Sequence, residues 1–248
     1  MEVHYHPHKE SQKKWKEYLI DFFMIFLAVT LGFFSENFKE HLSDTNRERD
    51  YIESFIQNLQ TDVGELKELL ADKEIMNGYD SLFRVDKTGF LKLPVQDSLF
   101  YYSVRYISTI RDFKQTDFTI IQLRNAGGYR LIQKRNVADS ISKYEEKNDN
   151  IKMQSALMIQ SFLSQFNYFD QIFDLSKVSR VFNGSTYASH IPGSEPVLIT
   201  NDYNKIALYI NQCYQTNLIY RGYRSMLNNH LNYLNRLIIF LKKEYHIN

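Results

Sequence analysis

The apolar positions near the start of the chain form one uninterrupted run. From Phe22 to Phe34 the sequence reads FFMIFLAVTLGFF, thirteen residues without a charge. A helix needs about 20 residues to cross a hydrocarbon core about 30 Å thick, and residues 18–38 supply that length with Asp21 and Glu36 near the ends. The pattern therefore predicts a transmembrane helix over residues 18–38.

A cleaved signal peptide and the buried helix of a soluble protein are the alternatives to an anchor. The segment ends in Gly32, Phe33, Phe34, Ser35 and Glu36, without an A-x-A-like pair of small residues, so an uncleaved anchor is favoured over a signal peptide. A run of about 10 to 14 apolar residues fits a core helix as well. Trp15 and Tyr18 lie where rings prefer the membrane interface, which favours the anchor.

Positive charge near the run predicts its orientation. Lys13, Lys14 and Lys16 precede the run closely, whereas Lys39 follows it in the company of acids, which count little. We therefore expect the N-terminus in the cytoplasm. Residues 1–17 then form a cytoplasmic tail, residues 18–38 the anchor and residues 39–248 an extramembrane domain.

One stripe of the predicted anchor could contact another helix. Steps of four and three residues place five positions on this stripe: Asp21, Ile25, Ala28, Gly32 and Ser35. Ala28 and Gly32 form a small-xxx-small pair that permits close helix approach, and Asp21 favours a polar partner near the interface. The alternative is that the small residues have no partner and Asp21 extends towards the headgroups.

After the anchor, a 4-3 spacing predicts a long amphipathic helix. Its apolar positions are Ile52, Ile56, Leu59, Val63, Leu66 and Leu70. Few helix breakers occur between Phe34 and Asn77, so we expect the anchor and this helix to form one continuous rod. Residues 82–93 then predict a small hairpin or an irregular loop.

Further helices are predicted over residues 95–113, 117–126 and 136–173, with a turn at Gly127 and Gly128. Turn residues between 178 and 200 predict the longest irregular stretch, where a functional loop is best placed. The last helix repeats a heptad at Ile206, Ile210, Cys213, Asn217, Tyr220, Arg224, Leu227, Leu231, Leu234, Ile238 and Leu241. The expected fold is all-α: the anchor continues into an antiparallel helical bundle with a small irregular or hairpin insertion. A coiled coil fits the last repeat equally well.

Composition narrows the functional classes. With 30 Lys and Arg against 29 Asp and Glu, the chain carries no strong field towards nucleic acid, which we do not expect as a partner. Only nine Gly and four Pro accompany 18 Tyr and 18 Phe, which favours long helices with ring-rich packing. Cys213 is the only cysteine, so it forms neither an intramolecular disulfide nor a thiolate cluster.

Sequence motifs give no catalytic residue. The chain lacks H-E-x-x-H, G-x-S-x-G, a P-loop and a dinucleotide-binding glycine fingerprint. His4, His6 and His8 alternate in the N-terminal tail and could ligate a metal if the tail were ordered, but a flexible tail is the simpler interpretation. We expect no catalytic site, no cofactor and no bound metal.

Two groups of cations are candidate anion sites. The first surrounds the Gly127–Gly128 turn and the second lies on the last helix; their arginines are Arg124, Arg130, Arg135, Arg221 and Arg224. Guanidinium groups bind carboxylates and phosphates through paired hydrogen bonds. The alternative is that these arginines pair with acids of the chain itself, with Glu145, Glu146 and Asp149 as candidate partners.

The stretch KKWKEYLIDFFMIFLAVTLGFFSENFKEHLSDTNRERDYIESF contains the elements W-K-E-Y, F-L-A-V-x-L-G-F-F and E-N. These resemble the opening of a family of uncharacterised bacterial single-span membrane-anchored proteins, catalogued as a domain of unknown function. FTIIQLRNAGGYRLIQKRNVADSISKYE is similar to that family's second landmark, with Ala126 and Gly127 at its turn. The resemblance covers most of the chain; it implies a bacterial membrane anchor and brings no activity, cofactor or catalytic residue.

Three functional hypotheses follow. The first is a non-enzymatic scaffold or interaction protein in the bacterial inner membrane, with a periplasmic domain that contacts the bilayer, a second copy or another envelope protein. The second is a periplasmic sensor or receptor domain that binds a small anionic ligand between helices. The third is an enzyme with an unfamiliar site. The short N-terminal tail favours the first over the second, because it is too short to hold a cytoplasmic output domain.

Overall fold

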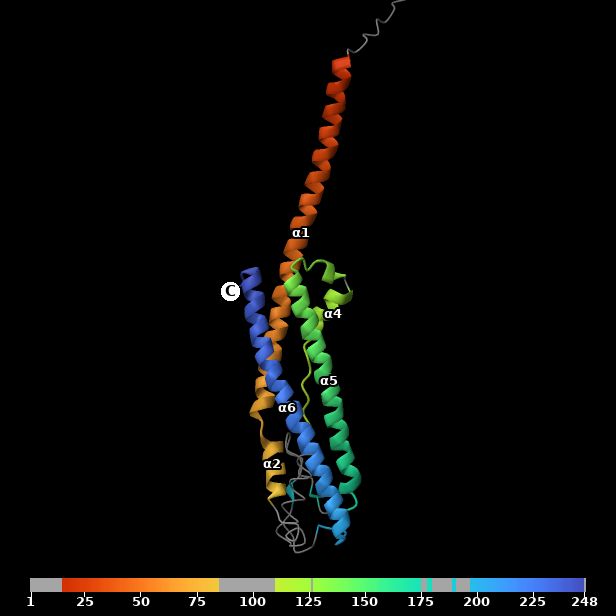
Figure 1. Cartoon of the computed structure of the whole chain (residues 1–248), viewed down its shortest axis with the longest axis vertical. Coiled ribbons are helices and arrows are strands. Elements are labelled where there is room, and N and C mark those ends of the chain that lie inside the picture. The colour runs from red at the N-terminus through yellow and green to blue at the C-terminus, as the bar shows by residue number, and fades with distance from the viewer. Residues whose placement is uncertain are drawn as a thin grey trace, which may run out of the picture. The chain divides into compact units, whose positions relative to one another are not determined.

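A computed structural model describes residues 15–84, 110–125, 127–174, 178–179, 189–190 and 197–247. The chain divides into two compact units, Met1–Asp50 and Tyr51–Asn248. In the described residues the structure is all-α, as predicted, apart from one pair of two-residue strands. Figure 1 shows the helices of the second unit. His4, His6 and His8 lie outside the described residues.

The described residues of the first unit, 15–50, form the N-terminal part of helix α1, Trp15–Ala71. This part contains the apolar run, and its most hydrophobic 18-residue window has a mean hydropathy of 2.0 with none of it buried. α1 is therefore long and apolar enough to span a membrane, by length and composition. It is also the only such helix in the described part of the chain.

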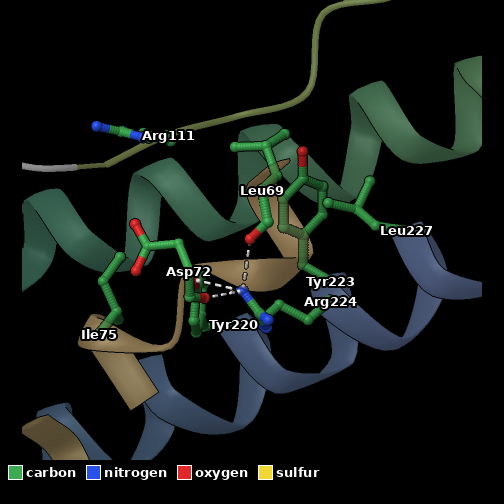
Figure 2. Close-up of a pocket in the computed structure, with 8 residues that line it drawn as sticks. All are labelled: Leu69, Asp72, Ile75, Arg111, Tyr220, Tyr223, Arg224 and Leu227. Carbon is green, nitrogen blue, oxygen red and sulfur yellow. Dashed lines mark hydrogen bonds between the residues drawn. The ribbon is translucent and has the colours of Figure 1, made fainter. Parts of the chain in front are cut away.

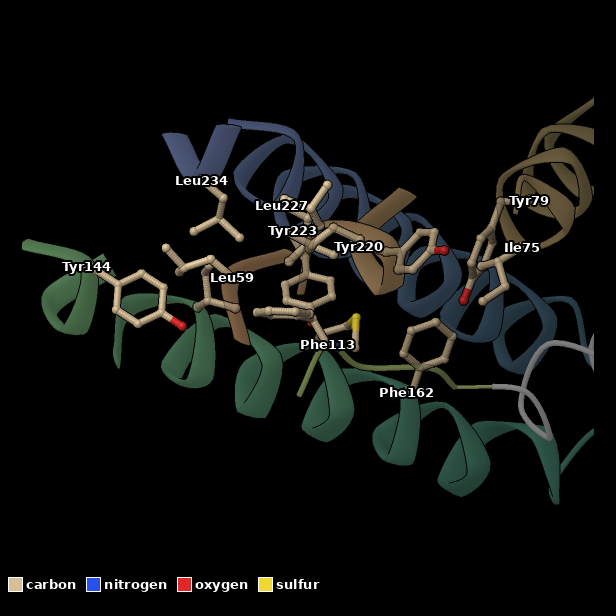
Figure 3. Packing of buried hydrophobic residues seen from close by; sticks show 14 of the residues in the cluster. Leu59, Ile75, Tyr79, Phe113, Tyr144, Phe162, Tyr220, Tyr223, Leu227 and Leu234 are labelled. Atoms are coloured by element: carbon tan, nitrogen blue, oxygen red, sulfur yellow. The ribbon is translucent and has the colours of Figure 1, made fainter. Parts of the chain in front are cut away.

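The second unit is built around a core of rings and aliphatic side chains. The C-terminal part of α1 contributes Ile52, Phe55, Leu59 and Leu66, each with no exposed surface. Phe55 meets Tyr144 edge to face, with ring centroids 5.2 Å apart. Figure 3 shows this packing continuing along the bundle through Phe113, Phe162 and Tyr223. The predicted apolar side of the helix after the anchor is confirmed from Ile52 to Leu66.

The long helix α1 ends at Ala71, although few helix breakers occur before Asn77. A separate helix α2, Glu74–Phe83, follows. The Asp72 carboxylate accepts a hydrogen bond of 2.9 Å from the Glu74 amide and so satisfies one of the first N–H groups of α2. α2 buries Ile75, Gly78, Tyr79 and Leu82 and packs on the last helix. Of the hairpin or loop expected over 82–93, Leu82 and Phe83 are instead helical, and residues 85–93 fall outside the described residues.

Residues 110–117 form an extended segment held by side chains of the helices. The Phe113 amide donates to the Tyr223 hydroxyl at 2.8 Å, and the Thr116 amide donates to Asp62 Oδ1 at 2.8 Å. The helix predicted over 95–113 is therefore wrong for 110–113, and its remainder lies outside the described residues. Because the two amides donate to side chains of other helices, tertiary contacts take the place of helical hydrogen bonds here.

Helix α4, Phe118–Asn125, and the short 3-10 helix η2, Gly128–Arg130, confirm the predicted helix and turn. Gly127 has φ 66°, a conformation that residues with a Cβ rarely adopt. A Cβ on Gly128 would come within 2.9 Å of the Leu123 side chain. Both glycines are therefore required for the tight return from α4 to the following helix.

The two longest helices of the second unit pack against each other along most of their length (Figure 1). They are α5, Arg135–Phe169, and α6, Tyr203–Tyr245. Asp202 caps α6 by accepting a hydrogen bond from the Asn204 amide at 2.9 Å. α5 ends four residues before the predicted end at Phe173, which instead forms an isolated bridge with Leu198.

Strands β1, Val178–Ser179, and β2, Ser189–His190, pair antiparallel within the predicted irregular stretch. The rest of residues 175–196 lies outside the described part. The described residues thus contain one small strand pair, in this stretch, and most of the hairpin predicted over 82–93 lies outside them.

Candidate functional site

The predicted contact stripe lies on an uncovered part of α1. Ile25 is 67% exposed, and a Cβ added to Gly32 would meet no atom within 4 Å. Ala28 and Ser35 are exposed as well, whereas Asp21 is half-exposed. The stripe therefore has room for a neighbouring helix, and its role as a contact surface remains a prediction.

Arg224 points into the junction between α1 and α2 (Figure 2). Its Nη1 donates to the carbonyl oxygens of Leu69 at 2.9 Å and Asp72 at 2.7 Å, and its Nη2 donates to the Leu70 carbonyl at 2.6 Å. The carbonyls of Leu69 and Leu70 belong to the end of α1, where the last C=O groups lack intrahelical partners, and Asp72 follows its last residue. The last turn of α1 has no basic residue of its own. Arg224 thus supplies, from α6, the positive charge that a helix C-terminus favours.

A shallow cleft lies beside Arg224, and its empty volume of about 320 Å³ includes space that is open to solvent. It is lined by Leu69, Asp72, Ile75, Arg111, Tyr220, Tyr223, Arg224 and Leu227. Both terminal nitrogens of Arg224 are engaged with backbone carbonyls, and the Asp72 carboxylate adds negative charge to the wall. This arrangement disfavours the binding of an anion by Arg224.

Arg221 lies one turn away on the same helix but has a different partner. Its Nη2 is 2.6 Å from Asp80 Oδ1, and its Nε donates to Asn217 Oδ1 at 3.2 Å. The Arg221 and Asp80 side chains are 40% and 45% exposed, so this ion pair is of the solvated kind that stabilises little. Arg221 and Arg224 therefore fasten α6 to α2 and α1 respectively.

In the first group of cations, Arg124 pairs with one of the acids proposed as its partner. Arg124 Nη2 lies 2.5 Å from Glu145 Oε1, and the Tyr129 hydroxyl donates to Glu145 Oε2 at 2.6 Å. Burial raises the pKa of Tyr129, and the hydrogen bond to Glu145 adds to the rise. Glu145 therefore joins α4 and the turn after it to α5.

The remaining arginines of this group do not join Arg124 in a common site. Arg135 is 3.9 Å from Asp139 on its own helix, with its side chain 95% exposed. Arg130 is exposed and has no ion-pair partner among the described residues. A second polar cleft, beside Arg124, also contains Asp117, Glu145 and Asp149, whose carboxylates disfavour an anion.

The structure contains a buried carboxylate, that of Asp62, which was not predicted from the sequence. Asp62 has no exposed surface; it accepts the Thr116 amide and, at 3.0 Å, the Tyr144 hydroxyl. Burial raises the pKa of Asp62, although these hydrogen bonds oppose the rise. The sequence contains a signal for the burial of Asp62, because this residue follows the 4-3 spacing of an apolar helix face together with Phe55, Leu59 and Leu66.

His230 on α6 is a second buried polar group. It is 3% exposed, and its ring stacks on Tyr144 at 6.0 Å between centroids. Among the described residues, neither of its nitrogens has a hydrogen-bond partner, and the buried Asn148 Oδ1 likewise has none. Burial, followed by the nearby Lys147 charge, lowers the pKa of His230 to about 4. The imidazole is therefore neutral at pH 7.

Within the described part of the chain, no three His, Cys, Asp or Glu side chains gather as metal ligands. The lone Cys213 is buried, and this burial raises its pKa to about 12, so it is a poor nucleophile. The resemblance to a membrane-anchored family stays a prediction. Comparisons of the chain with protein-family models, curated proteins and solved structures found no match.

Proposed function

We propose that this protein is a membrane-anchored helical scaffold or interaction protein of the bacterial cell envelope, without catalytic activity. The observation that carries the proposal is the uncovered apolar part of α1, of which none is buried in the 18-residue window. A helix of this hydropathy in the core of a soluble protein would be covered by other elements. The hydrocarbon core of a lipid bilayer is apolar and has the thickness that this part of α1 would span.

The proposed topology is a single pass through the inner membrane, with the N-terminus in the cytoplasm and the second unit in the periplasm. Its support is the cluster of Lys13, Lys14 and Lys16 before the span. A phosphatase that folds only in the periplasm, fused after Asn248, should be active. If a reporter that works only in the cytoplasm is active at the same position, the topology is the opposite of the proposed one.

The contacts of the candidate arginines support a protein that binds partners through its surface over an enzyme or a ligand sensor, because these arginines are already engaged within the chain. Arg124, Arg221 and Arg224 each bind a group of the chain itself. Affinity capture after mild detergent extraction should retain a protein partner in fixed proportion. Thermal stabilisation by a small carboxylate or phosphate that disappears in Arg221→Ala would favour the receptor hypothesis instead.

Two arginines in the span should release the protein from the membrane. Leu27 and Leu31 are 53% and 65% exposed, and arginine near the centre of a spanning helix is strongly disfavoured. Leu27→Arg/Leu31→Arg is expected to move the full-length protein from the carbonate-resistant membrane fraction to the soluble or aggregated fraction, as measured by immunoblotting.

The matched control is Leu42→Arg/Ile239→Arg, which places the same charges at sites 53% and 68% exposed but outside residues 18–38. This variant should stay in the membrane. Equal retention of both variants, or a wild-type chain that carbonate removes, would reject the anchor.

A further inference from the structure

One end of the second unit carries a cluster of cations. The end of α6 and the start of α5 meet there, because Lys134 Nζ lies 3.8 Å from Glu244 Oε2 and 4.3 Å from the centroid of the Tyr245 ring. Positive charge is concentrated on these two helix ends and on the turn before α5. Their Lys and Arg residues, which we call the basic end, are Arg130, Lys134, Arg135, Lys242 and Lys243.

The acids at this end of the second unit do not cancel the cluster. Glu244 is the partner of Lys134, and Asp139 Oδ2 lies 3.9 Å from Arg135 Nε. Glu53 of α1 is half-buried and interacts within the fold. The five cations of the basic end thus outnumber these acids, whereas the whole chain is nearly balanced, with 30 Lys and Arg against 29 Asp and Glu. The positive excess is therefore local.

Two members of the basic end are available to an outside anion. Arg130 and Lys243 are exposed, and neither has an ion-pair partner among the described residues. The start of α5 adds to the positive potential, because the Lys134 side chain does not cap the helix and the first turn contains no acid. Guanidinium groups and the N–H groups of a helix N-terminus both bind phosphate. The basic end therefore combines several groups that favour a phosphate.

The basic end is also the end at which the chain leaves the second unit towards the anchor. Within this unit, α1 and α6 run antiparallel (Figure 1), and Arg224 meets Leu70 near the end of α1. Tyr51, the first residue of the unit, lies 19 residues before Leu70, and Lys243 lies 19 residues after Arg224. Because the two helices rise equally per residue, Lys243 lies at about the level of Tyr51.

The chain between the predicted span and Tyr51 is short. Residues 39–50 are helical, so their length is about 18 Å. The lipid headgroups occupy about 6 Å on each side of a bilayer, which leaves about 12 Å. A lysine stem and a Debye length of about 8 Å together cover this distance, and the usual tilt of a spanning helix, about 20°, shortens it on one side. The charges of the basic end are therefore within reach of the headgroups.

We propose that the basic end binds the phosphate groups of anionic lipids in the membrane that holds the anchor. A cluster of Lys and Arg next to a span is attracted to a negatively charged lipid surface, and the attraction falls off within a Debye length. The inference rests on the proposed membrane anchoring, which brings the basic end to the lipids. It adds to the span a second contact with the bilayer, made by the folded unit itself.

The test uses the full-length protein in nonionic detergent, titrated with phosphatidylglycerol or phosphatidylcholine. Native mass spectrometry gives the dissociation constant of each lipid. The wild type should bind phosphatidylglycerol at least about threefold more tightly than phosphatidylcholine. Arg130→Glu/Lys243→Glu should weaken phosphatidylglycerol binding at least about threefold and leave phosphatidylcholine binding unchanged. The matched control Lys67→Glu/Lys205→Glu makes the same change of charge at exposed positions outside the basic end and should bind as the wild type does.

Circular dichroism checks that each variant folds, and Arg130→Gln/Lys243→Gln replaces the double variant if it does not. Equal affinity of the wild type for the two lipids, or a preference that the basic-end variant retains or the matched control loses, would overturn the proposal. A preference lost only in Lys13→Gln/Lys14→Gln/Lys16→Gln would also overturn it and would place the anionic lipid at the other end of the span. Carbonate extraction separates these failures from a failure of anchoring, since every one of these variants should remain in the membrane.

Discussion

Replacing Arg224 with alanine is expected to lower the free energy of unfolding of the second unit by about 4 kcal/mol, within the range for charged hydrogen bonds lost together. The guanidinium satisfies three carbonyl oxygens, those of Leu69, Leu70 and Asp72. They lie where α1 ends and α2 begins, so alanine would remove both the hydrogen bonds and the charge that favours a helix C-terminus. The contact also ties α6 to that junction.

Thermal unfolding of the full-length protein, followed by circular dichroism in nonionic detergent, should show a midpoint lower by about 10 °C. Arg224→Lys should lie between wild type and Arg224→Ala, because an ammonium group cannot reach all three carbonyls with good geometry. Arg221→Ala is the matched control; its ion pair with Asp80 is solvated and its loss should cost less than about 1 kcal/mol. Equal losses in the two alanine variants would contradict the capping role of Arg224.

The long helices could be predicted from sequence because a repeat of apolar positions is a local signal. The predicted limits of the helix over 117–126 agree with α4 to within one residue. On α6, however, the predicted seam passed through Leu231 and Ile238, which are half-buried, whereas His230 and Leu237 are the buried residues. A strict seven-residue repeat drifts against 3.6 residues per turn, so the buried face of a long helix moves off it.

The break between α1 and α2 could not be predicted in the same way. The sequence around Asp72 contains neither proline nor glycine, and its propensity alone is compatible with a continuous helix. The groups that stabilise the break are the Asp72 carboxylate and the guanidinium of Arg224, which is 152 residues further along the chain. A contact over such a separation leaves no periodic signal near the break.

The candidate arginine sites show the same difference between partners that residue types indicate and partners that they do not. Pairing of Arg124 with Glu145 was foreseen, because an acid-rich stretch suggested a partner of opposite charge. The partners of Arg224 are backbone carbonyls, which every residue has, so residue types cannot identify them. Asp62 and His230 show the converse: each follows the spacing of an apolar helix face, and a search for polar residues on such faces would have found both.

His230 should make the second unit sensitive to acid. The pKa of a histidine in the unfolded chain is about 6.5, whereas burial lowers that of folded His230 to about 4. The folded state therefore binds this proton less readily than the unfolded state. Stability from this group is complete above about pH 7 and is lost as the pH falls from 6.5 through 4, by about 2 to 3 kcal/mol at pH 4.5.

The groups around His230 allow this loss to be isolated. Lys147 adds to the low pKa of His230, whereas the raised pKa of Asp62 acts in the opposite sense and stabilises the fold as the pH falls towards 3.8. His230→Phe retains both groups and a ring for the stack on Tyr144. It also removes two buried nitrogens without partners in the described residues, so it should be more stable than wild type by about 1 kcal/mol at pH 8.

Urea unfolding of the full-length protein at pH 8 and pH 4.5 measures the effect. The advantage of His230→Phe over wild type should grow by about 2 to 3 kcal/mol between the two pH values. His41→Gln, which replaces an exposed histidine, is the control for the loss of an imidazole as such. An advantage that stays constant with pH would mean that His230 titrates equally in both states, as it would if water or a polar group solvated it in the fold. The buried imidazole, and not the total number of histidines, is therefore what should set the acid limit of this bundle.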